Sequence, residues 1–136
     1  REVIEQVGLF DPRFFMYCEE VDHCHATRKA GWDITYYPAP VVHLGGESAK
    51  SDAVISTSGR QIKVLQIESE LLYFRKNFGV GGVVLHVCLT TVANTLQAIK
   101  KAIRLAPLSA IRSHFEHSRL TWTLFFRSRA GTQGSR

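Results

Sequence analysis

Three carboxylates stand close together near the start of the chain, directly behind a run of large apolar side chains. They are Glu19, Glu20 and Asp22, within the stretch FFMYCEEVDHC. Carboxylates so placed could take a proton from a hydroxyl group, which is general-base chemistry. They also suit the solvated first turn of a helix, where the helix dipole favours negative charge. The residue types alone leave both interpretations open.

A second cluster holds side chains that commonly bind metals. It consists of Cys18, His23, Cys24, His25 and His43. Its spacing matches no structural zinc pattern, so a zinc module is disfavoured. The chain has three cysteines in all, an odd number without a CxxC pair, which indicates a reducing compartment rather than a disulfide framework.

The elements around the carboxylates can be predicted from their end signals. Acidic residues in the first turn, Arg28 and Lys29 in the last turn and a stop at Gly31 predict a helix over residues 19–30. Residues 32–38, WDITYYP, predict a short strand. Residues 40–46 predict a second extended piece, and residues 47–59 a polar loop.

Helical patterns dominate the second half of the chain. An amphipathic helix is predicted over residues 60–78, with Gly79 as its stop. Residues 79–99 carry no charge but show two faces. The polar face comprises His86, Thr90, Asn94, Gln97, Lys101 and Arg104, and the apolar face Leu85, Leu89, Val92, Leu96, Ile99 and Ile103. The pattern favours a helix lying in the membrane plane, with a spanning helix and a core or oligomer helix as alternatives.

The charge distribution supports a membrane rather than a nucleic acid as partner. The 136-residue chain has a net charge of +5, and residues 100–136 hold eight Lys or Arg against Glu116 alone. A basic end behind an uncharged apolar stretch favours an anionic membrane surface. No aromatic stacking pattern accompanies these cations, so no nucleic-acid partner is expected. The composition of residues 127–136 predicts a disordered tail.

One segment resembles a known family. Residues 7–48 read VGLFDPRFFMYCEEVDHCHATRKAGWDITYYPAPVVHLGGES. They look like the second half of the catalytic domain of family 2 glycosyltransferases, particularly the rhamnosyltransferase-like members. The matching residues are Gly8, Phe10, Asp11, Phe14, Phe15, Tyr17, Glu19, Asp22, Arg28, Ala30, Gly31, Trp32, Pro38, His43, Gly46 and Ser48. Residues 68–79 are similar to the helix that follows in these enzymes.

The resemblance implies a fold and a division of the chain. It implies the C-terminal part of an α/β GT-A fold, the nucleotide-diphospho-sugar transferase fold, with its acceptor-side half in residues 1–78. A helical, membrane-associated region would follow in residues 79–126, and the tail in residues 127–136. The sequence holds no Asp-x-Asp triplet, which these enzymes carry in the nucleotide-binding half. The chain is therefore expected to be a fragment, inactive alone.

The resemblance also assigns roles to residues. Glu20 occupies the position of the family's catalytic base, which is usually Asp; Glu19 would be the second candidate, and Asp22 an orienting or capping partner. Candidate substrate-binding residues are Tyr17, Trp32, Gly45, Gly46 and Ser48, although large aromatics more often pack in cores. His43 matches the position that reaches a divalent cation, Mg²⁺ or Mn²⁺, or the diphosphate.

The function implied is inverting transfer of a sugar from a nucleotide-sugar donor to a glycan or lipid-linked acceptor, in cell-surface polysaccharide biosynthesis. The location implied is cytoplasmic, at the inner face of the plasma membrane. The alternative is a non-catalytic membrane-binding or interaction module that retains part of the fold.

Overall fold

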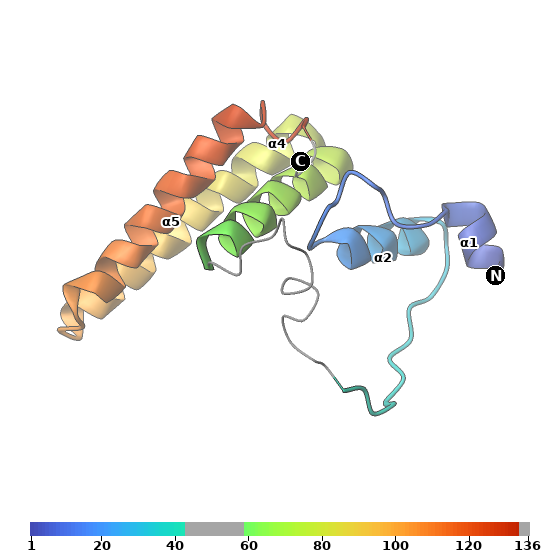
Figure 1. Cartoon of the computed structure of the whole chain (residues 1–136), viewed down its shortest axis with the longest axis horizontal. Helices are drawn as coiled ribbons and strands as arrows, with labels where there is room; N and C mark the ends of the chain where they lie inside the picture. The colour runs from blue at the N-terminus through green and yellow to red at the C-terminus, as the bar shows by residue number, and fades with distance from the viewer. Residues whose placement is uncertain (43–58, 134–136) are drawn as a thin grey trace.

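The described residues form helices joined by extended segments. The computed structural model describes residues 1–42 and 59–133. Its helices are α1 (Glu2–Val7), α2 (Glu19–Lys29), α4 (Gly59–Ile103) and α5 (Leu108–Arg127) (Figure 1). Within these two ranges there is no strand. The expected α/β GT-A architecture is therefore wrong for this part of the chain, which is helical.

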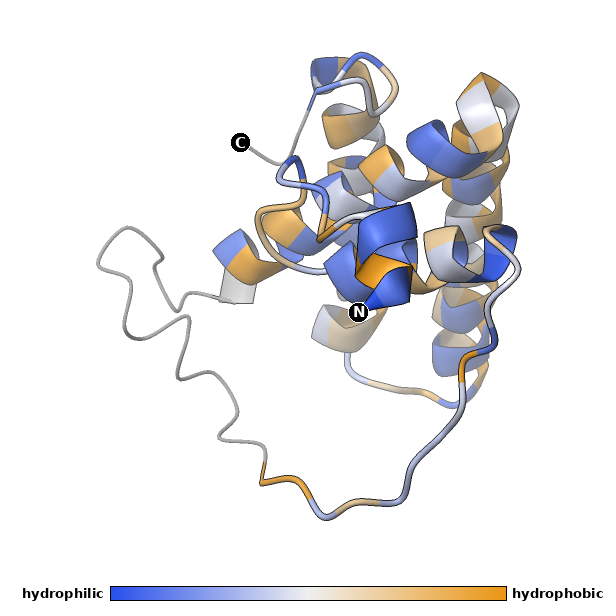
Figure 2. Cartoon of the chain, turned by 90° about the vertical axis from the view of Figure 1, so that its right-hand side faces the viewer, coloured by the Kyte–Doolittle hydropathy of each residue, from blue (hydrophilic) through white to orange (hydrophobic). Residues whose placement is uncertain are grey.

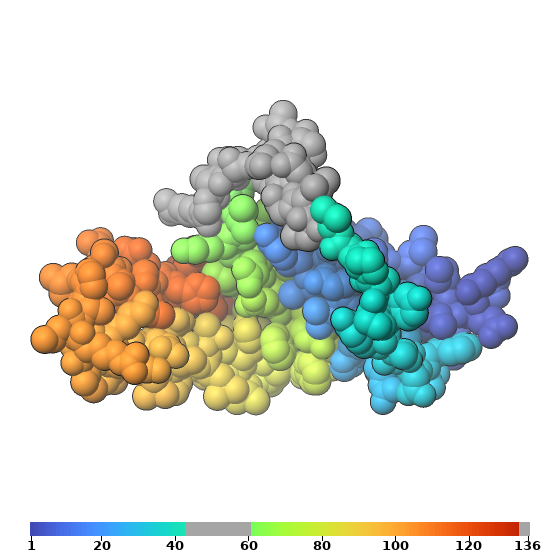
Figure 3. All heavy atoms as spheres, turned by 90° about the horizontal axis from the view of Figure 1, so that it is seen from below, coloured from blue at the N-terminus to red at the C-terminus, as the bar shows by residue number. Residues whose placement is uncertain are grey.

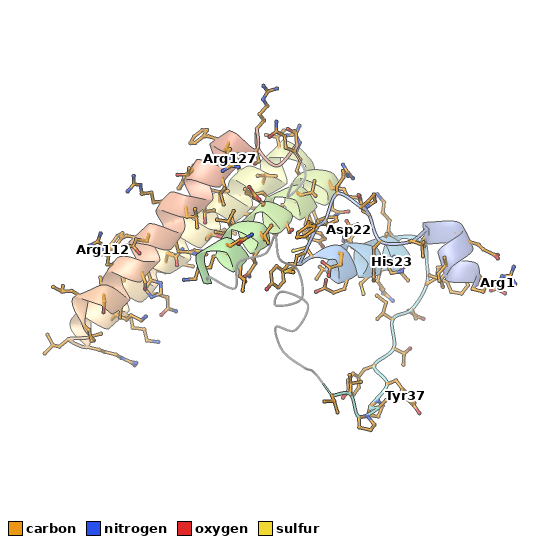
Figure 4. All side chains as sticks on the ribbon, in the orientation of Figure 1. Arg1, Asp22, His23, Tyr37, Arg112 and Arg127 are labelled. Atoms are coloured by element: carbon orange, nitrogen blue, oxygen red, sulfur yellow. The ribbon has the colours of Figure 1, made fainter. Side chains whose placement is uncertain are left out.

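The strand expected over residues 32–38 does not form. These residues continue from α2 as an extended segment without ladder hydrogen bonds, and Figure 4 shows Tyr37 on it, well away from the helices. Tyr36 and Tyr37 are exposed. β-branched and aromatic residues favour a strand only where a neighbouring strand and a covered face receive them, and the described residues supply neither.

The long helix α4 folds back on itself at Gly79. That glycine has φ 68° and ψ −164°, a conformation essentially restricted to glycine. The rings of Phe74 and His86 stack with centroids 4.2 Å apart, whereas a straight helix would separate them by about 18 Å along its axis. The helix predicted over residues 60–78 thus ends at Gly79, as expected. We call residues 59–78 the N-arm and residues 80–103 the C-arm of α4.

Helix α5 returns along both arms, so three helical rods lie side by side (Figure 1). Their core contains the buried residues Ile67, Leu71, Val83, Val87 and Leu124. The indole Nε1 of Trp122 donates a hydrogen bond to Thr91 Oγ1 at 3.0 Å, which ties α5 to the C-arm. Of the expected tail over residues 127–136, Arg127 is the last residue of α5, and residues 128–133 form hydrogen-bonded turns after it.

The C-arm exposes apolar side chains to the outside of the bundle. Orange bands of hydrophobic residues recur along the helices in Figure 2. In the C-arm the predicted apolar face is exposed, from 50% at Ile99 to 77% at Ile103. By length and composition, α4 is apolar enough to cross a membrane over Gln61–Ile103, and 11% of its most apolar window is buried. The fold-back at Gly79 divides that span into two antiparallel rods.

Candidate active site at the start of helix α2

Helix α2 presents the three carboxylates on its first turn. It runs over Glu19–Lys29, which confirms the helix predicted from its end signals. At the C-terminal end of the helix, the backbone amide of Gly31 donates a hydrogen bond to the carbonyl of Arg28. Gly31 has φ +91°, a conformation that glycine adopts without steric cost. The acidic residues therefore lie at the positive end of the helix dipole, which stabilises their charge.

A strained turn leads into this helix. Tyr17 and Cys18 have φ values of 70° and 64°, which cost non-glycine residues of the order of 1 kcal/mol each. The turn is held from the side by the N-arm, where the hydroxyl of the fully buried Ser69 donates a hydrogen bond to the Met16 carbonyl at 2.7 Å. The contact fixes the direction in which Glu19 and Glu20 leave the turn.

Asp22 lies at the junction of α2 with the N-arm. It is buried, and Figure 4 shows it where the two helices approach each other. Lys76 Nζ donates to Asp22 Oδ2 at 2.5 Å, and Asn77 Nδ2 donates to Oδ1 at 2.9 Å. Both carboxylate oxygens are thus engaged by side chains of the N-arm. These contacts of Asp22 reach across to another helix, so they are those of an anchor.

Lys76 also reaches Asp11, in the loop before α2. Its Nζ donates to Asp11 Oδ2 at 2.8 Å, and Arg13 binds both oxygens of the same carboxylate. The hydrogen bonds from Arg13 and then Lys76 outweigh desolvation and hold the pKa of Asp11 well below its ordinary value. One lysine thereby joins the loop, α2 and α4 through two carboxylates.

Glu20 is the carboxylate of the three that is exposed to solvent. Glu19 is half-buried, and its Oε2 is buried without a hydrogen-bond partner. Burial, reinforced by the negative charges of Glu70, Glu20 and Glu19, raises the pKa of the Cys18 thiol to about 11. That thiol stays protonated near neutral pH and is a poor nucleophile there. Of the three carboxylates, that of Glu20 is the most accessible to a ligand from solvent.

The other predicted site residues divide into two sets. The indole Nε1 of Trp32 donates to Gln6 Oε1 at 2.8 Å, so Trp32 ties the segment after α2 to α1. Tyr17 is half-buried in the strained turn itself. The rest of the predicted set, His43, Gly45, Gly46 and Ser48, lies outside the described residues.

The described residues do not supply a metal centre. In residues 1–42 and 59–133, no group of three or more His, Cys, Asp or Glu side chains is arranged to hold a metal ion. The side chains of α2 therefore do not fit the expected divalent cation by themselves.

The supporting residues on the N-arm were not predicted as part of a site. Ser69 and Lys76 fall on one side of the helix with Ile62, Leu65 and Leu72, which is visible from their spacing. A serine and a lysine on an otherwise apolar side are the signal that this side meets polar groups of another segment. The sequence does not say which segment that is.

Comparison with known proteins gives one partial likeness. The chain is 45% identical over 53 residues to proteins named N-acetylglucosaminyl-diphospho-decaprenol L-rhamnosyltransferase in two strains of Mycobacterium tuberculosis, CDC 1551 and H37Rv. The match covers 38% of this chain and 17% of the relative in each case. No family model matches, and no solved structure matches. The likeness supports a glycosyltransferase-like relationship.

Proposed function

We propose that this chain is the acceptor-side part of an inverting glycosyltransferase, with Glu20 as its general base. The sugar would pass from a nucleotide-sugar donor to a hydroxyl of a lipid-linked glycan, in cell-surface polysaccharide synthesis at the cytoplasmic face of a membrane. The observation that carries the proposal is the position of Glu20, exposed on the first turn of a helix whose orientation Ser69 and Lys76 fix. The 45% identity to rhamnosyltransferases supports the same class.

The transfer needs one proton acceptor on this side of the reaction. The acceptor oxygen forms a bond to the anomeric carbon while the bond from that carbon to the diphosphate breaks, and the nucleoside diphosphate leaves with the electron pair. The hydroxyl proton passes to the Glu20 carboxylate. Because Asp22 is already engaged by Lys76 and Asn77, it keeps α2 in place and does not compete for that proton.

The decisive experiment replaces Glu20 in the product of the complete reading frame that contains this chain. Transfer is measured from a panel of nucleotide sugars that includes activated rhamnose, with a polyprenyl-diphosphate-linked N-acetylglucosamine as acceptor. Glu20→Gln should lower kcat by about 100-fold or more with unchanged helicity. The exposed Glu116→Gln, on α5, is the matched control and should keep full activity. Equal turnover in both variants would refute the assignment of Glu20.

A second candidate function is a non-catalytic membrane-binding or interaction module. It is favoured by the helical architecture of the described residues and by the exposed apolar face of the C-arm. The same assay separates the two functions: a complete protein that transfers no sugar with any donor but still binds membranes is such a module.

A further inference from the structure

The C-arm of α4 carries large apolar side chains on its outward side, where an ordinary bundle helix is polar. Its outward row, which we call the apolar stripe, consists of Leu85, Leu89, Val92, Leu96, Ile99 and Ile103, each at least 50% exposed. These residues recur every three or four positions and so form a single row about 27 Å long. Contiguous exposed apolar surface marks an interaction site more often than scattered single residues do.

The inward side of the same helix buries Val83, Val87 and Ala98 and carries polar side chains between and beyond them. Thr91 Oγ1 accepts the hydrogen bond from Trp122, His114 Nδ1 lies 3.2 Å from Asn94 Oδ1, and Lys101 Nζ donates to the Ala110 carbonyl at 3.5 Å. All of these partners belong to α5. Polar side chains thus pair between the two helices while leucine and isoleucine point outward, which suits an apolar medium better than water.

The packing of α5 against the C-arm limits how the C-arm can contact a lipid bilayer. Hydrogen bonds at the middle and the C-terminal end of the C-arm, and the core shared with Leu124 near its start, keep α5 beside it over its length, so both helices reach the same depth. Helix α5 carries Arg112, Glu116 and Arg119, and the side chains of the first two are 81% and 63% exposed. Charged side chains at the centre of a bilayer are strongly disfavoured. The two helices therefore cannot cross a bilayer together, but they can lie on it.

The charges near the apolar stripe indicate which kind of membrane surface it would bind. Lys100 lies in the last turn of the C-arm, beside the stripe, and Arg104 follows the last stripe residue one position after α4 ends; both are exposed. Residues 79–99 contain no charge, and residues 100–136 hold eight cations against one anion. In Figure 3 the C-arm, in yellow, lies along the middle of the lower edge of the molecule. A row of apolar side chains with cations at one end matches the headgroup boundary of an anionic leaflet.

We propose that the apolar stripe is a membrane-docking surface that sinks into one leaflet of an anionic bilayer, with the C-arm parallel to the membrane plane and Lys100 and Arg104 at the phosphate level. The inference deepens the proposed function, on which it rests for the lipid-linked acceptor. Vesicle binding is measured without sugar transfer, so either proposal can fail alone.

The test is cosedimentation of the chain with phosphatidylcholine vesicles that contain phosphatidylglycerol. Leu89→Ser/Leu96→Ser should lower the partition coefficient at least about tenfold. The control Leu9→Ser/Tyr37→Ser removes apolar residues that are even more exposed but lie off the stripe, and should bind like the original chain. Helicity should be unchanged in both variants. Equal binding by the stripe variant and the original chain, or equal losses in both double variants, would overturn the proposal.

Two further measurements test charge and depth. Lys100→Gln/Arg104→Gln should weaken binding about tenfold on anionic vesicles, whereas Arg1→Gln/Lys29→Gln, with the same charge change elsewhere, should not.

A fluorophore on the exposed Cys88, beside the stripe, should be quenched by lipids labelled near the headgroup more than by lipids labelled at the acyl end. Quenching mainly from the bilayer centre would show a spanning helix. A self-associated chain that dissociates on Leu89→Ser/Leu96→Ser without losing vesicle binding would assign the stripe to a second copy instead. Either result would contradict the proposal.

Discussion

The two arms of α4 are joined at Gly79 but differ in what their outward sides carry. The N-arm buries Leu65, Ile67, Leu71 and Leu72 and uses polar residues to hold α2 and the loop before it. The C-arm buries Val83, Val87 and Ala98 and turns its longest aliphatic side chains outward. The N-arm packs against α2 as well as against the rest of the bundle, while the described residues leave the outward side of the C-arm uncovered.

This difference in packing indicates a different role for each arm. The N-arm is a scaffold: it orders the turn at Tyr17 and Cys18 and anchors Asp22, so that Glu20 is presented at a fixed place. The C-arm supplies a surface whose partner is outside the chain. If both proposals hold, the fold-back at Gly79 connects the element that positions the proposed base to the element that holds the protein on the membrane carrying its acceptor.

The largest expected effect compares one leucine on each arm. Leu71→Ala removes a fully buried side chain from the core and should lower the free energy of unfolding by about 3 kcal/mol. Leu89→Ala removes one that is 57% exposed, so it should cost less than about 0.5 kcal/mol in water. Urea unfolding followed by circular dichroism measures both. Equal losses would mean that the stripe is covered in solution, and the contrast between the arms would disappear.

A smaller effect is expected at the polar contacts of the N-arm. Lys76→Met keeps the length of the side chain but leaves Asp22 buried without its cation, and removes one of the cations on Asp11. The loss in unfolding free energy should be about 2 kcal/mol, below the cost of breaking a fully buried pair because Lys76 is partly exposed. The exposed Lys63→Met on the same arm is the control and should change little. A loss in Lys76→Met as small as that in the control would show that α2 is held by apolar contacts alone.

The sequence predicted the helices better than it predicted their surroundings. The start of α2 at Glu19 and the break at Gly79 follow from local signals, since helix-end charges and glycine act on neighbouring backbone. The strand at residues 32–38 failed because strand formation depends on a partner segment, which local sequence cannot reveal. The two faces of residues 79–99 were also predictable, but periodicity defines faces without saying which one meets the protein. The contacts of Trp122 with Thr91 and of His114 with Asn94 show which face packs against α5.

The same limit applies to the candidate site. The carboxylates and the helix that presents them could be found from residue type and spacing. The separation of their roles could not, because it depends on which N-arm side chains reach them: Asp22 meets Lys76 and Asn77, and Glu20 meets solvent. Residues 53 to 55 positions apart in the chain make these contacts, and no local pattern encodes them.

The last prediction concerns the residue that separates the two arms. Gly79→Ala places a side chain at φ 68° and ψ −164°, so the folded chain should lose about 1–2 kcal/mol of unfolding free energy. Gly81→Ala, two residues later, adds a methyl group in open space within the helix and should gain about 0.5–1 kcal/mol. Thermal unfolding of the two variants measures the two changes in unfolding free energy. If Gly79→Ala is as well tolerated as Gly81→Ala, α4 can pass through this point as a continuous helix. The antiparallel packing of its arms, with Phe74 against His86, would then be dispensable, and a spanning helix would again be open to this segment.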